Sequence, residues 1–422
     1  MLDLIIKNAV LSDGRRVDVA VAGGKIAAVE PDISTVAEQS IDAQGYLLSS
    51  PFVDAHFHLD STLSLGNPRL NQSGTLLEGI QIWNELKPEL TVENIKDRAR
   101  RLCHWAIARG TLAIRSHVDI CDDRLLAVQA LLELREELKQ WIDIQLVAFP
   151  QDGYFRYENS AANLDRALQM GVDVVGGIPH FERNQSEGAR SVAALCEIAA
   201  EKGVMVDMHC DESDDPLSRH VETLAFETQR LGLYGRVTGS HLTSMHSMDN
   251  YYVSKLMVLM SEAQLNVVAN PLINITLQGR HDSYPKRRGM TRAKELLAQG
   301  INVAFGHDCV MDPWYSFGSH DMLEVAHMGI HVGQMTGVDE IKQAFAAVTT
   351  NAARVMNLPD YGITAGSNAD FVLLQARDPA EAIRLRAARL LVVRRGEVIA
   401  RTQAVQSELT LGGDKQLIDW ML

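Results

Sequence analysis

The sequence predicts an α/β protein with a TIM-type (β/α)8 barrel and a small β-sandwich domain built from both chain ends. Three observations predict this fold. Through the middle of the chain, apolar strand segments alternate with long amphipathic helical segments, which is the pattern of a parallel sheet joined by helices. Eight such strand segments can be counted, and eight is the strand number of this barrel. At both ends the chain instead carries short strands separated by tight turns.

The length and composition fit this architecture. A chain of 422 residues suits a barrel of about 250 residues plus a further domain. Hydrophobic residues make up 46% of the chain and charged residues 22%, and no run of about 18 apolar residues occurs, so we expect neither disorder nor a membrane span. The N-terminal stretch lacks the features of a secretory signal, and the five cysteines are scattered without a C-x-x-C pair. We therefore expect a cytoplasmic protein with reduced cysteines.

The charge of the chain bears on its partners. Its 40 Lys and Arg residues and 54 Asp and Glu residues give a formal net charge of −14. This negative charge disfavours any partner held through phosphates, so we do not expect a nucleic-acid polymer as ligand. A neutral or cationic small molecule is the more natural partner.

The two chain ends are predicted to form one domain. Residues 2–47 contain short strands with hairpin signals at Asp13-Gly14 and Gly23-Gly24. Short strand segments of the same kind occur at residues 369–376 and 389–402, where Arg395-Gly396 supplies the turn. We expect residues 1–48 and 360–422 to form the sandwich and residues 49–359 to form the barrel between them.

The barrel strands are predicted from apolar runs. They are residues 47–59, 110–120, 142–151, 173–181, 204–212, 236–243, 265–273 and 301–309. In such a barrel the reactive groups lie where the strands end. One loop is unusual, residues 277–292 after the seventh strand, whose basic cluster could be a solvated lid or a subunit contact, and the solvated interpretation is the default.

The first barrel strand carries the first indication of a metal site. It ends in His56, Phe57 and His58, and the alternation of an extended strand puts both imidazoles on one side, about 7 Å apart in Cα rise. Neutral imidazole is the commonest protein ligand for zinc or iron. Alone, this pattern could equally be two ordinary loop histidines, so the later strands must supply the other ligands.

The remaining strand ends do supply chemically active residues. The residues at strand ends are His56 and His58 on the first strand, Gln151 after the third, His209 and Glu212 on the fifth, His241 on the sixth and Asp308 on the eighth. All of them fall at the same pole of the predicted barrel. Scattered core histidines would have no reason to do this, so the pattern predicts one shared site.

At these stretches the sequence resembles the amidohydrolase superfamily, and within it the bacterial cytosine deaminases. The matching stretches lie between residues 51 and 315 and are FVDAHFHLD, NQSGTLLEGI, AFPQDG, GGIPHFE, HCDES, SHLTSMHS, ANPLINITLQGR, YPKRRGMTR and GHDCVMDPW. The resemblance covers nearly the whole chain, and the set of motifs is far more specific than H-x-H alone.

The resemblance implies one divalent metal ion, Fe2+ or Zn2+, held by four ligands: His56, His58, His209 and Asp308. Three neutral imidazoles and one carboxylate leave such an ion a net positive charge and a position for water, whose pKa it can lower to about 7. The fourth strand segment, residues 173–181, ends without a lysine that could be carboxylated and bridge a second ion. We therefore expect a mononuclear site.

The resemblance also implies the roles of the proton-transfer residues. Glu212 would carry a proton from the metal-activated water to the ring nitrogen beside the attacked carbon. His241 would hydrogen-bond the attacking oxygen and stabilise the developing charge, while Asp308 would accept a proton. Read alone, Glu212 could be a capping or surface carboxylate in the run DESDD, and His241 a strand-end histidine bonded to backbone.

Three residues are predicted to contact the substrate. Gln151 offers one carbonyl and one NH2, the complement of a cyclic amide edge, although a lone glutamine is more often a surface residue. Trp314 could form a wall of the pocket or belong to the core. Cys309 stands where the cytosine deaminases usually carry a second aspartate after the metal ligand. Direct contact by His117 or His180, which also lie near strand ends, is left open.

The change at Cys309 suggests a substrate preference. A cysteine is small and largely apolar, so it leaves room for a 5-methyl group that a buried aspartate would oppose. Burying that methyl is worth about 0.8 kcal/mol, a few-fold in rate or affinity. The alternative is that Cys309 only packs behind Asp308 and the substrate is plain cytosine.

Taken together, these observations predict hydrolytic deamination of a free pyrimidine base, cytosine or 5-methylcytosine, to uracil or thymine plus ammonia by a metal-activated water. One alternative is the same machinery acting on isoguanine, another aminated heterocycle or a cyclic amide. A remote alternative is a barrel without catalysis that serves as a scaffold. The family resemblance suggests a homo-oligomer, for which the residues give no independent signature.

Overall fold

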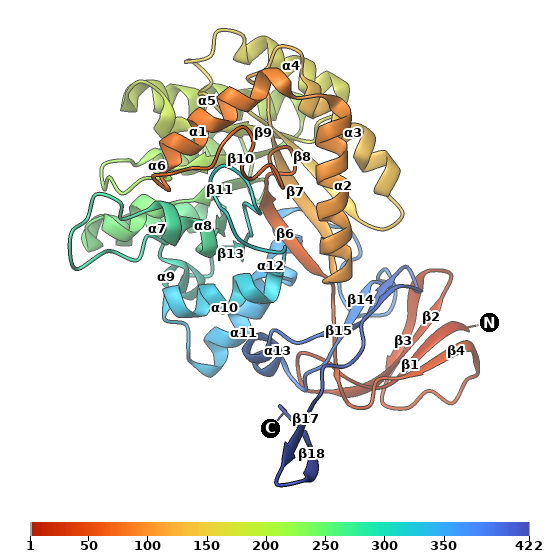
Figure 1. Ribbon diagram of the computed structural model, residues 1–422. Coiled ribbons are helices and arrows are strands. Elements are labelled where there is room, and N and C mark those ends of the chain that lie inside the picture. The colour runs from red at the N-terminus through yellow and green to blue at the C-terminus, as the bar shows by residue number, and fades with distance from the viewer. Residues whose placement is uncertain (1, 422) are drawn as a thin grey trace.

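The computed structural model describes residues 2–421 and contains a barrel, a β-sheet domain beside it and a short C-terminal hairpin (Figure 1). Within these residues the barrel sheet has eight strands in the order β13-β12-β11-β10-β9-β8-β7-β6, and each neighbouring pair is parallel. The strands are β6 Phe52–Phe57, β7 Thr111–Asp119, β8 Asp143–Phe149, β9 Val174–Gly177, β10 Met205–Cys210, β11 Val237–His241, β12 Asn266–Ala269 and β13 Asn302–Phe305. The predicted barrel is confirmed.

The first and last barrel strands meet at a seam. Phe57 of β6 forms a parallel bridge with Asp308, three residues beyond β13. The Asp308 N–H donates to the carbonyl of His56 at 2.9 Å, and the His58 N–H donates to the carbonyl of Asp308 at 3.0 Å. The backbone of the site residues themselves therefore joins the two edges of the sheet.

Helices surround the barrel (Figure 1). They are α1 Leu76–Leu86, α2 Val92–Ala108, α3 Leu126–Leu138, α4 Ser160–Met170, α5 Gln185–Lys202, α6 His220–Arg230, α7 Asn250–Glu262, α8 Pro271–Leu277, α9 Ala293–Ala298, α10 Met322–Gly333, α11 Val338–Ala347, α12 Thr350–Val355 and α13 Pro379–Leu385, with 3-10 turns η1 Lys87–Glu89, η2 Pro179–Phe181 and η3 Thr243–Ser247. Their ends follow local chemistry. The side chain of Asn184 caps α5 by accepting from the N–H of Glu187 at 3.0 Å, and the helix stops at Gly203, whose φ of 71° is left-handed.

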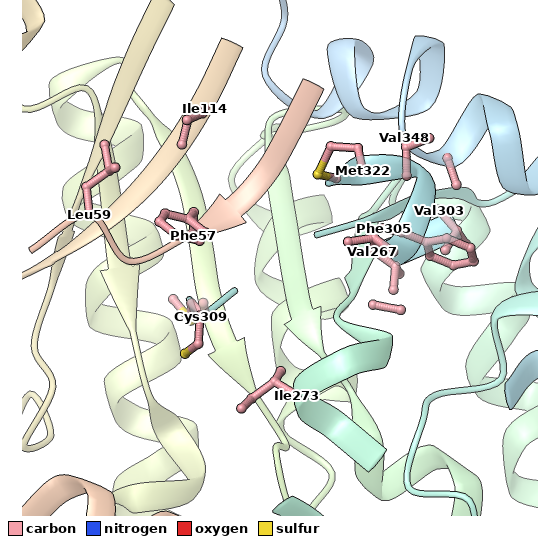
Figure 2. Close-up of a cluster of buried hydrophobic side chains, with 14 of the residues drawn as sticks. Phe57, Leu59, Ile114, Val267, Ile273, Val303, Phe305, Cys309, Met322 and Val348 are labelled. Atoms are coloured by element: carbon pink, nitrogen blue, oxygen red, sulfur yellow. The ribbon is translucent and has the colours of Figure 1, made fainter. Parts of the chain in front are cut away.

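The barrel strands are buried on both faces, which explains why they read as nearly continuous apolar runs. All nine residues of β7 and all four of β9 and of β12 are buried. Figure 2 shows one part of the core, where Phe57 of β6, Phe305 of β13 and Ile273 of α8 belong to the same cluster of buried side chains. The polar residues at the strand ends therefore stand on a rigid apolar base.

Both chain ends build one β-sheet domain, as predicted. Its strands are β1 Leu2–Val10, β2 Arg16–Ala22, β3 Lys25–Glu30, β4 Ala37–Asp42, β5 Leu47–Ser49, β14 Phe371–Leu374, β15 Arg389–Arg394 and β16 Glu397–Arg401. They are hydrogen-bonded into one sheet in the order β16-β15-β14-β5-β1-β2-β3, with β4 paired to β1. The antiparallel pair of β5 and β14 joins the two halves of the domain.

Two further features complete the chain. The hairpin of β17 Ser407–Leu411 and β18 Asp414–Ile418 forms a separate two-stranded sheet, which projects away from the barrel in Figure 1. None of the helices within residues 2–421 combines the length and apolar character that crossing a bilayer requires.

Candidate active site

The predicted site residues lie together at the carboxyl ends of the barrel strands. His56 is in β6 and His58 follows it, His209 is in β10, His241 is the last residue of β11, and Asp308 lies in the seam after β13. All five side chains are buried. The parallel strands bring them to one pole because each strand ends on the same side of the sheet.

The ligand atoms of these residues converge. Nε2 of His58 lies 3.0 Å from Nε2 of His209. Oδ1 of Asp308 lies 3.6 Å from Nε2 of His56 and 3.4 Å from Nε2 of His58. The candidate ligand atoms of His56, His58 and His209 all fall within 4.8 Å of one another. This spacing is compatible with donors gathered around one ion.

The hydrogen bonding of the cluster also fits a cation. Both ring nitrogens of His56 and Nδ1 of His209 are buried without a hydrogen-bond partner among the described residues. Leaving such groups unpaired costs about 1 to 3 kcal/mol each, so a buried set of them indicates a missing partner. A divalent cation supplies that partner for nitrogen lone pairs.

The protonation states favour metal binding as well. Burial lowers the pKa of His58 to about 4 and that of His209 well below its usual value, so both rings are neutral and keep a lone pair. For Asp308, burial acts to raise the pKa, but the neighbouring rings of His56, His241 and His58 outweigh it and lower the pKa below the usual range. Neutral imidazoles beside an ionised carboxylate are the donor set that zinc or iron binds.

His117 lies beneath this cluster. Its ring centroid is 4.1 Å from that of His56, and its Nε2 is 3.7 Å from Oδ1 of Asp207. Asp207 is already paired with the buried guanidinium of Arg115 at 2.9 Å and accepts from the Ser240 hydroxyl at 2.7 Å. Because a buried arginine disfavours a second cation nearby, this lower group does not suit a further metal ion.

The backbone is strained at two site residues. His241 has a φ of 70° and Asp308 a φ of 69°, in the left-handed region that residues with a side chain seldom adopt. Such a conformation costs on the order of 1 kcal/mol and persists only where the surrounding structure holds it. At His241 the turn re-directs the chain where β11 ends, and at Asp308 it occurs within the seam with β6.

Glu212 lies at the edge of the cluster. Its Oε1 is 3.4 Å from Nδ1 of His241. Burial, reinforced by the negative charge of Asp308, raises the pKa of Glu212 well above its usual value. This shift favours the protonated carboxyl, which can donate a proton to a bound ligand.

A cavity opens at this pole of the barrel. It is lined by His58, Leu76, Ile80, Gln151, Ile178, His180, Phe181, His209, Glu212, His241, Ile273, Leu277, Asp308, Cys309 and Trp314. The structure thus brings Gln151, Cys309 and Trp314 to the same cavity as the cluster, and His180 joins them. His56 and His117 are not among the lining residues.

Cys309 and Trp314 form part of the cavity wall. The Cys309 Sγ lies 3.6 Å from Oδ1 of Asp308, and Figure 2 shows its side chain within the buried apolar cluster near Ile273. Burial raises the pKa of the Cys309 thiol well above its usual value, so the thiol is neutral. The Trp314 ring centroid lies 6.5 Å from that of His58, and a Cβ placed on Gly79 of α1 would come within 2.3 Å of the indole.

Sequence reasoning did not identify the apolar lining from α1, η2 and α8. Leu76, Ile80, Phe181, Ile273 and Leu277 line the cavity from these helical segments. Leu76 and Ile80 are four residues apart, and so are Ile273 and Leu277, which puts each pair on one helix face. That spacing was the available signal, but the same spacing is expected for any core-facing helix.

A (β/α)8 barrel whose strands end in converging histidines and an aspartate offers the donor set of a divalent-metal enzyme. A model of the amidohydrolase family matches residues 39–405. The chain belongs to the amidohydrolase family, and it is an enzyme that hydrolyses C–N bonds with a divalent metal ion.

Individual relatives narrow the reaction class. The chain is 41% identical to 5-methylcytosine deaminase from Klebsiella pneumoniae, whose structure with 5-fluorocytosine superposes with a TM-score of 0.92 and covers 95% of this chain and 98% of that one. It is 31% identical over 416 residues to the N-isopropylammelide isopropyl amidohydrolase of Pseudomonas sp. (strain ADP), covering 96% and 98% of the two chains. The corresponding isopropylaminohydrolase structure from Burkholderia multivorans is 27% identical, with a TM-score of 0.84, and covers 95% and 99%. The predicted resemblance to the cytosine deaminases is confirmed, and the reaction class is hydrolytic deamination of an aminated heterocycle.

Proposed function

We propose that this protein deaminates a free aminopyrimidine base, 5-methylcytosine above all and cytosine as well, giving thymine or uracil and ammonia. The observation that carries the choice of substrate is the neutral, buried thiol of Cys309 in the cavity wall beside Asp308. The 41% identity to the 5-methylcytosine deaminase of Klebsiella pneumoniae supports the same choice. The expected homo-oligomer stays a prediction.

His56, His58, His209 and Asp308 are the proposed ligands of a single Fe2+ or Zn2+ ion. The support is the convergence of their donor atoms, the unpaired ring nitrogens and the ionised state of Asp308. When bound there, the cation supplies a water molecule whose pKa is lowered to about 7.

Gln151 is proposed to orient the base. Its side-chain carbonyl accepts from the ring N1–H and its NH2 donates to the C2 carbonyl, which is a complementary pair. Gln151 follows β8 and Glu212 follows β10, so both reach the same cavity from neighbouring parts of the barrel. With the N1–C2 edge held by Gln151, ring nitrogen N3 and carbon C4 turn toward Glu212 and Asp308.

Proton transfer then follows from the resting states of the two carboxyl groups. Glu212, whose pKa burial raises, donates a proton to N3 and takes one from the attacking water as its oxygen bonds to C4. Asp308, ionised at rest, accepts the second proton of that water and returns it to the exocyclic amine. The C4–N bond breaks, and ammonia leaves a product with a carbonyl at C4 and hydrogen on N3.

The cavity wall favours a substrate with a methyl at C5. The apolar lining keeps bulk water away from the ring and strengthens the interactions of the few polar groups. A 5-methyl group buried against the Cys309 thiol gains about 0.8 kcal/mol, which is about fourfold in rate or affinity. An aspartate at this position would place a desolvated carboxylate, or the polar protonated carboxyl, against the methyl.

A substrate panel with matched variants tests this proposal. We expect the enzyme loaded with Zn2+ or Fe2+ to release ammonia from 5-methylcytosine and cytosine, with the higher kcat/KM for 5-methylcytosine. Cys309→Asp should lower kcat/KM for 5-methylcytosine by about fivefold or more relative to cytosine, since a desolvated polar group costs at least about 1 kcal/mol. Cys309→Ala, which keeps the space without adding charge, serves as the matched control and should retain the preference.

The outcomes separate the alternatives. An unchanged preference in Cys309→Asp would overturn the role of Cys309. Turnover of isoguanine or N-isopropylammelide without turnover of either pyrimidine would place the substrate elsewhere among aminated heterocycles. Bound metal without turnover of any of these compounds would favour a scaffold.

A further inference from the structure

Two buried asparagines stand on the far side of His241 from the ligand cluster. Asn270 precedes α8 and Asn274 lies within it, and both side chains are fully buried. The backbone N–H of Asn274 donates to the carbonyl of Asn270 at 2.9 Å, so the first turn of α8 fixes the two residues relative to each other. Nδ2 of Asn274 lies 2.9 Å from Nδ1 of His241.

The orientation of the Asn274 amide is determined by its neighbours. The backbone N–H of Asn270 points at the Asn274 side chain, where it donates to Oδ1 at 3.1 Å. A backbone N–H can only donate, so the atom facing it must be the carbonyl oxygen. The NH2 group of Asn274 therefore faces His241 and donates to Nδ1.

This contact determines where His241 carries its proton. A histidine ring carries at least one N–H, on Nδ1 or on Nε2. Because Nδ1 accepts from Asn274, the proton resides on Nε2. That nitrogen is buried, has no hydrogen-bond partner among the described residues, and lies 3.8 Å from Oδ2 of Asp308.

The other neighbours of Nδ1 agree with this assignment. Nδ2 of Asn270 approaches Nδ1 at 3.3 Å as a second donor. Oε1 of Glu212 is 3.4 Å from Nδ1, farther away than the Asn274 amide nitrogen at 2.9 Å. The two amide nitrogens are therefore the nearest groups to Nδ1, and Nε2 faces Asp308.

We propose that Asn274 is a positioning residue that fixes His241 as the Nε2–H tautomer, so that His241 donates a hydrogen bond to the oxygen attacking the substrate and leaves the acceptance of its protons to Glu212 and Asp308. The second half of this statement rests on the proposed deamination, while the tautomer itself does not. A donor aimed at the position where negative charge develops stabilises the transition state without having to reorganise.

The tautomer can be measured directly. In the zinc-loaded protein labelled with 15N-histidine, the two ring nitrogens of a neutral histidine give separate NMR signals according to which one carries hydrogen. His241→Gln identifies the signals by their loss. We expect His241 to show the Nε2–H form in the wild type. Asn274→Asp should reverse it, because a carboxylate accepts from both the Asn270 N–H and Nδ1–H, and the nearly isosteric Asn274→Leu should leave a mixture of the two forms.

The kinetic expectation follows from the tautomer. Asn274→Asp should lower kcat for the pyrimidine substrate by about 100-fold, comparable to the loss of one oxyanion donor, with KM nearly unchanged. Asn274→Leu should lose less, about tenfold. Thr276→Ala removes the bond from the Thr276 hydroxyl to the carbonyl of Leu272 within α8, but no contact with His241. It is the matched control for a loosened helix and should keep the Nε2–H signal and the wild-type kcat.

Two results would overturn the inference: an Nδ1–H signal for His241 in the wild type, or the Nε2–H form in both Asn274 variants. A wild-type protein that shows the Nε2–H form, loses it in the variants and turns over no aminopyrimidine would instead support the role of Asn274 while refuting the proposed substrate.

Discussion

Nε2 of His58 lies 3.0 Å from Nε2 of His209, and burial keeps both imidazoles neutral. A hydrogen bond between two such atoms needs a proton on one of them, and that proton occupies the lone pair that a metal ligand must offer. The two rings come from β10 and from the end of β6, so the closed barrel imposes this approach. A cation between the two rings can accept a lone pair from each of them, whereas a hydrogen bond between the rings uses the lone pair of only one.

The first prediction concerns removal of that cation. We expect one divalent ion per chain and a Tm several degrees lower after chelation, because a ligand present at 1,000 times its Kd stabilises the folded state by about 4 kcal/mol. Calorimetry and elemental analysis on the same sample measure both quantities. His209→Ala should bind little metal and show no further effect of the chelator, and two ions per chain would contradict the prediction.

The second prediction concerns proton transfer by Glu212. Glu212→Gln imitates the protonated carboxyl in size and charge but cannot give up a proton, so kcat should fall by about 100-fold to 10,000-fold while KM stays within a few-fold. Steady-state kinetics on the preferred pyrimidine provide the measurement. Asp215→Asn, an exposed residue of the same acidic run, is the control and should behave as wild type. A Glu212→Gln enzyme within tenfold of the wild-type kcat would show that another group carries the proton.

The third prediction concerns the wall formed by Trp314. Gly79→Ala places a methyl against the indole, where the ideal Cβ would lie 2.3 Å from it, so Trp314 must move toward the cavity or out of it. We expect KM to rise about tenfold with a smaller change in kcat, together with a shift in tryptophan fluorescence. The free energy of unfolding should change little, because the better helix propensity of alanine, up to about 1 kcal/mol, offsets part of the cost of crowding. Leu77→Ala, whose side chain is 68% exposed on the same helix, should leave KM unchanged.

The fourth prediction concerns stability and pH at Asp312. Burial raises the pKa of this carboxyl to about 7, although hydrogen bonds from the Cys309 thiol and from the backbone of Trp314 and Tyr315 oppose the shift. In the unfolded chain the group ionises near pH 4, so the folded state retains its proton over a range in which the unfolded state loses one. Folding stability therefore falls as the pH rises from about 4 to about 7, by up to about 4 kcal/mol from this group.

Asp312→Asn removes that titration. We expect denaturant unfolding to show that the free energy of unfolding of the variant, relative to that of the wild type, is higher at pH 8 than at pH 5. This holds whatever the relative stability at pH 5. A difference between the two proteins that does not change with pH would mean that Asp312 is ionised in the folded state.

Most of the barrel could be predicted because buried parallel strands leave a strong apolar signature. The prediction was less exact for residues 47–59. Their apolar pattern predicts one strand, but they form β5 in the sheet domain and β6 in the barrel. Only Ser50 and Pro51 separate them, and hydrophobicity cannot tell which sheet a short strand joins. The hairpin of β17 and β18 is largely exposed, so it lacks the alternation of buried and exposed residues that would predict its strands.

The convergence of the site residues could be predicted because parallel strands all end at one pole. The surrounding contacts could not. His117 and His180 both lie near strand ends, yet one packs beneath His56 and the other lines the cavity. Asn274 lies on a helix beyond a strand end, and its part depends on the direction of one amide, which only the folded contacts with Asn270 and His241 determine.

The seam between β6 and the segment after β13 has a consequence for how the enzyme matures. His56 and His58 are made early on the ribosome, but the carboxylate that faces them is 250 residues further along and its backbone closes the barrel. A nascent chain that ends before residue 308 contains the three proposed histidine ligands but lacks the proposed carboxylate ligand. The proposed ligand set is therefore complete only after nearly three quarters of the chain has been synthesised.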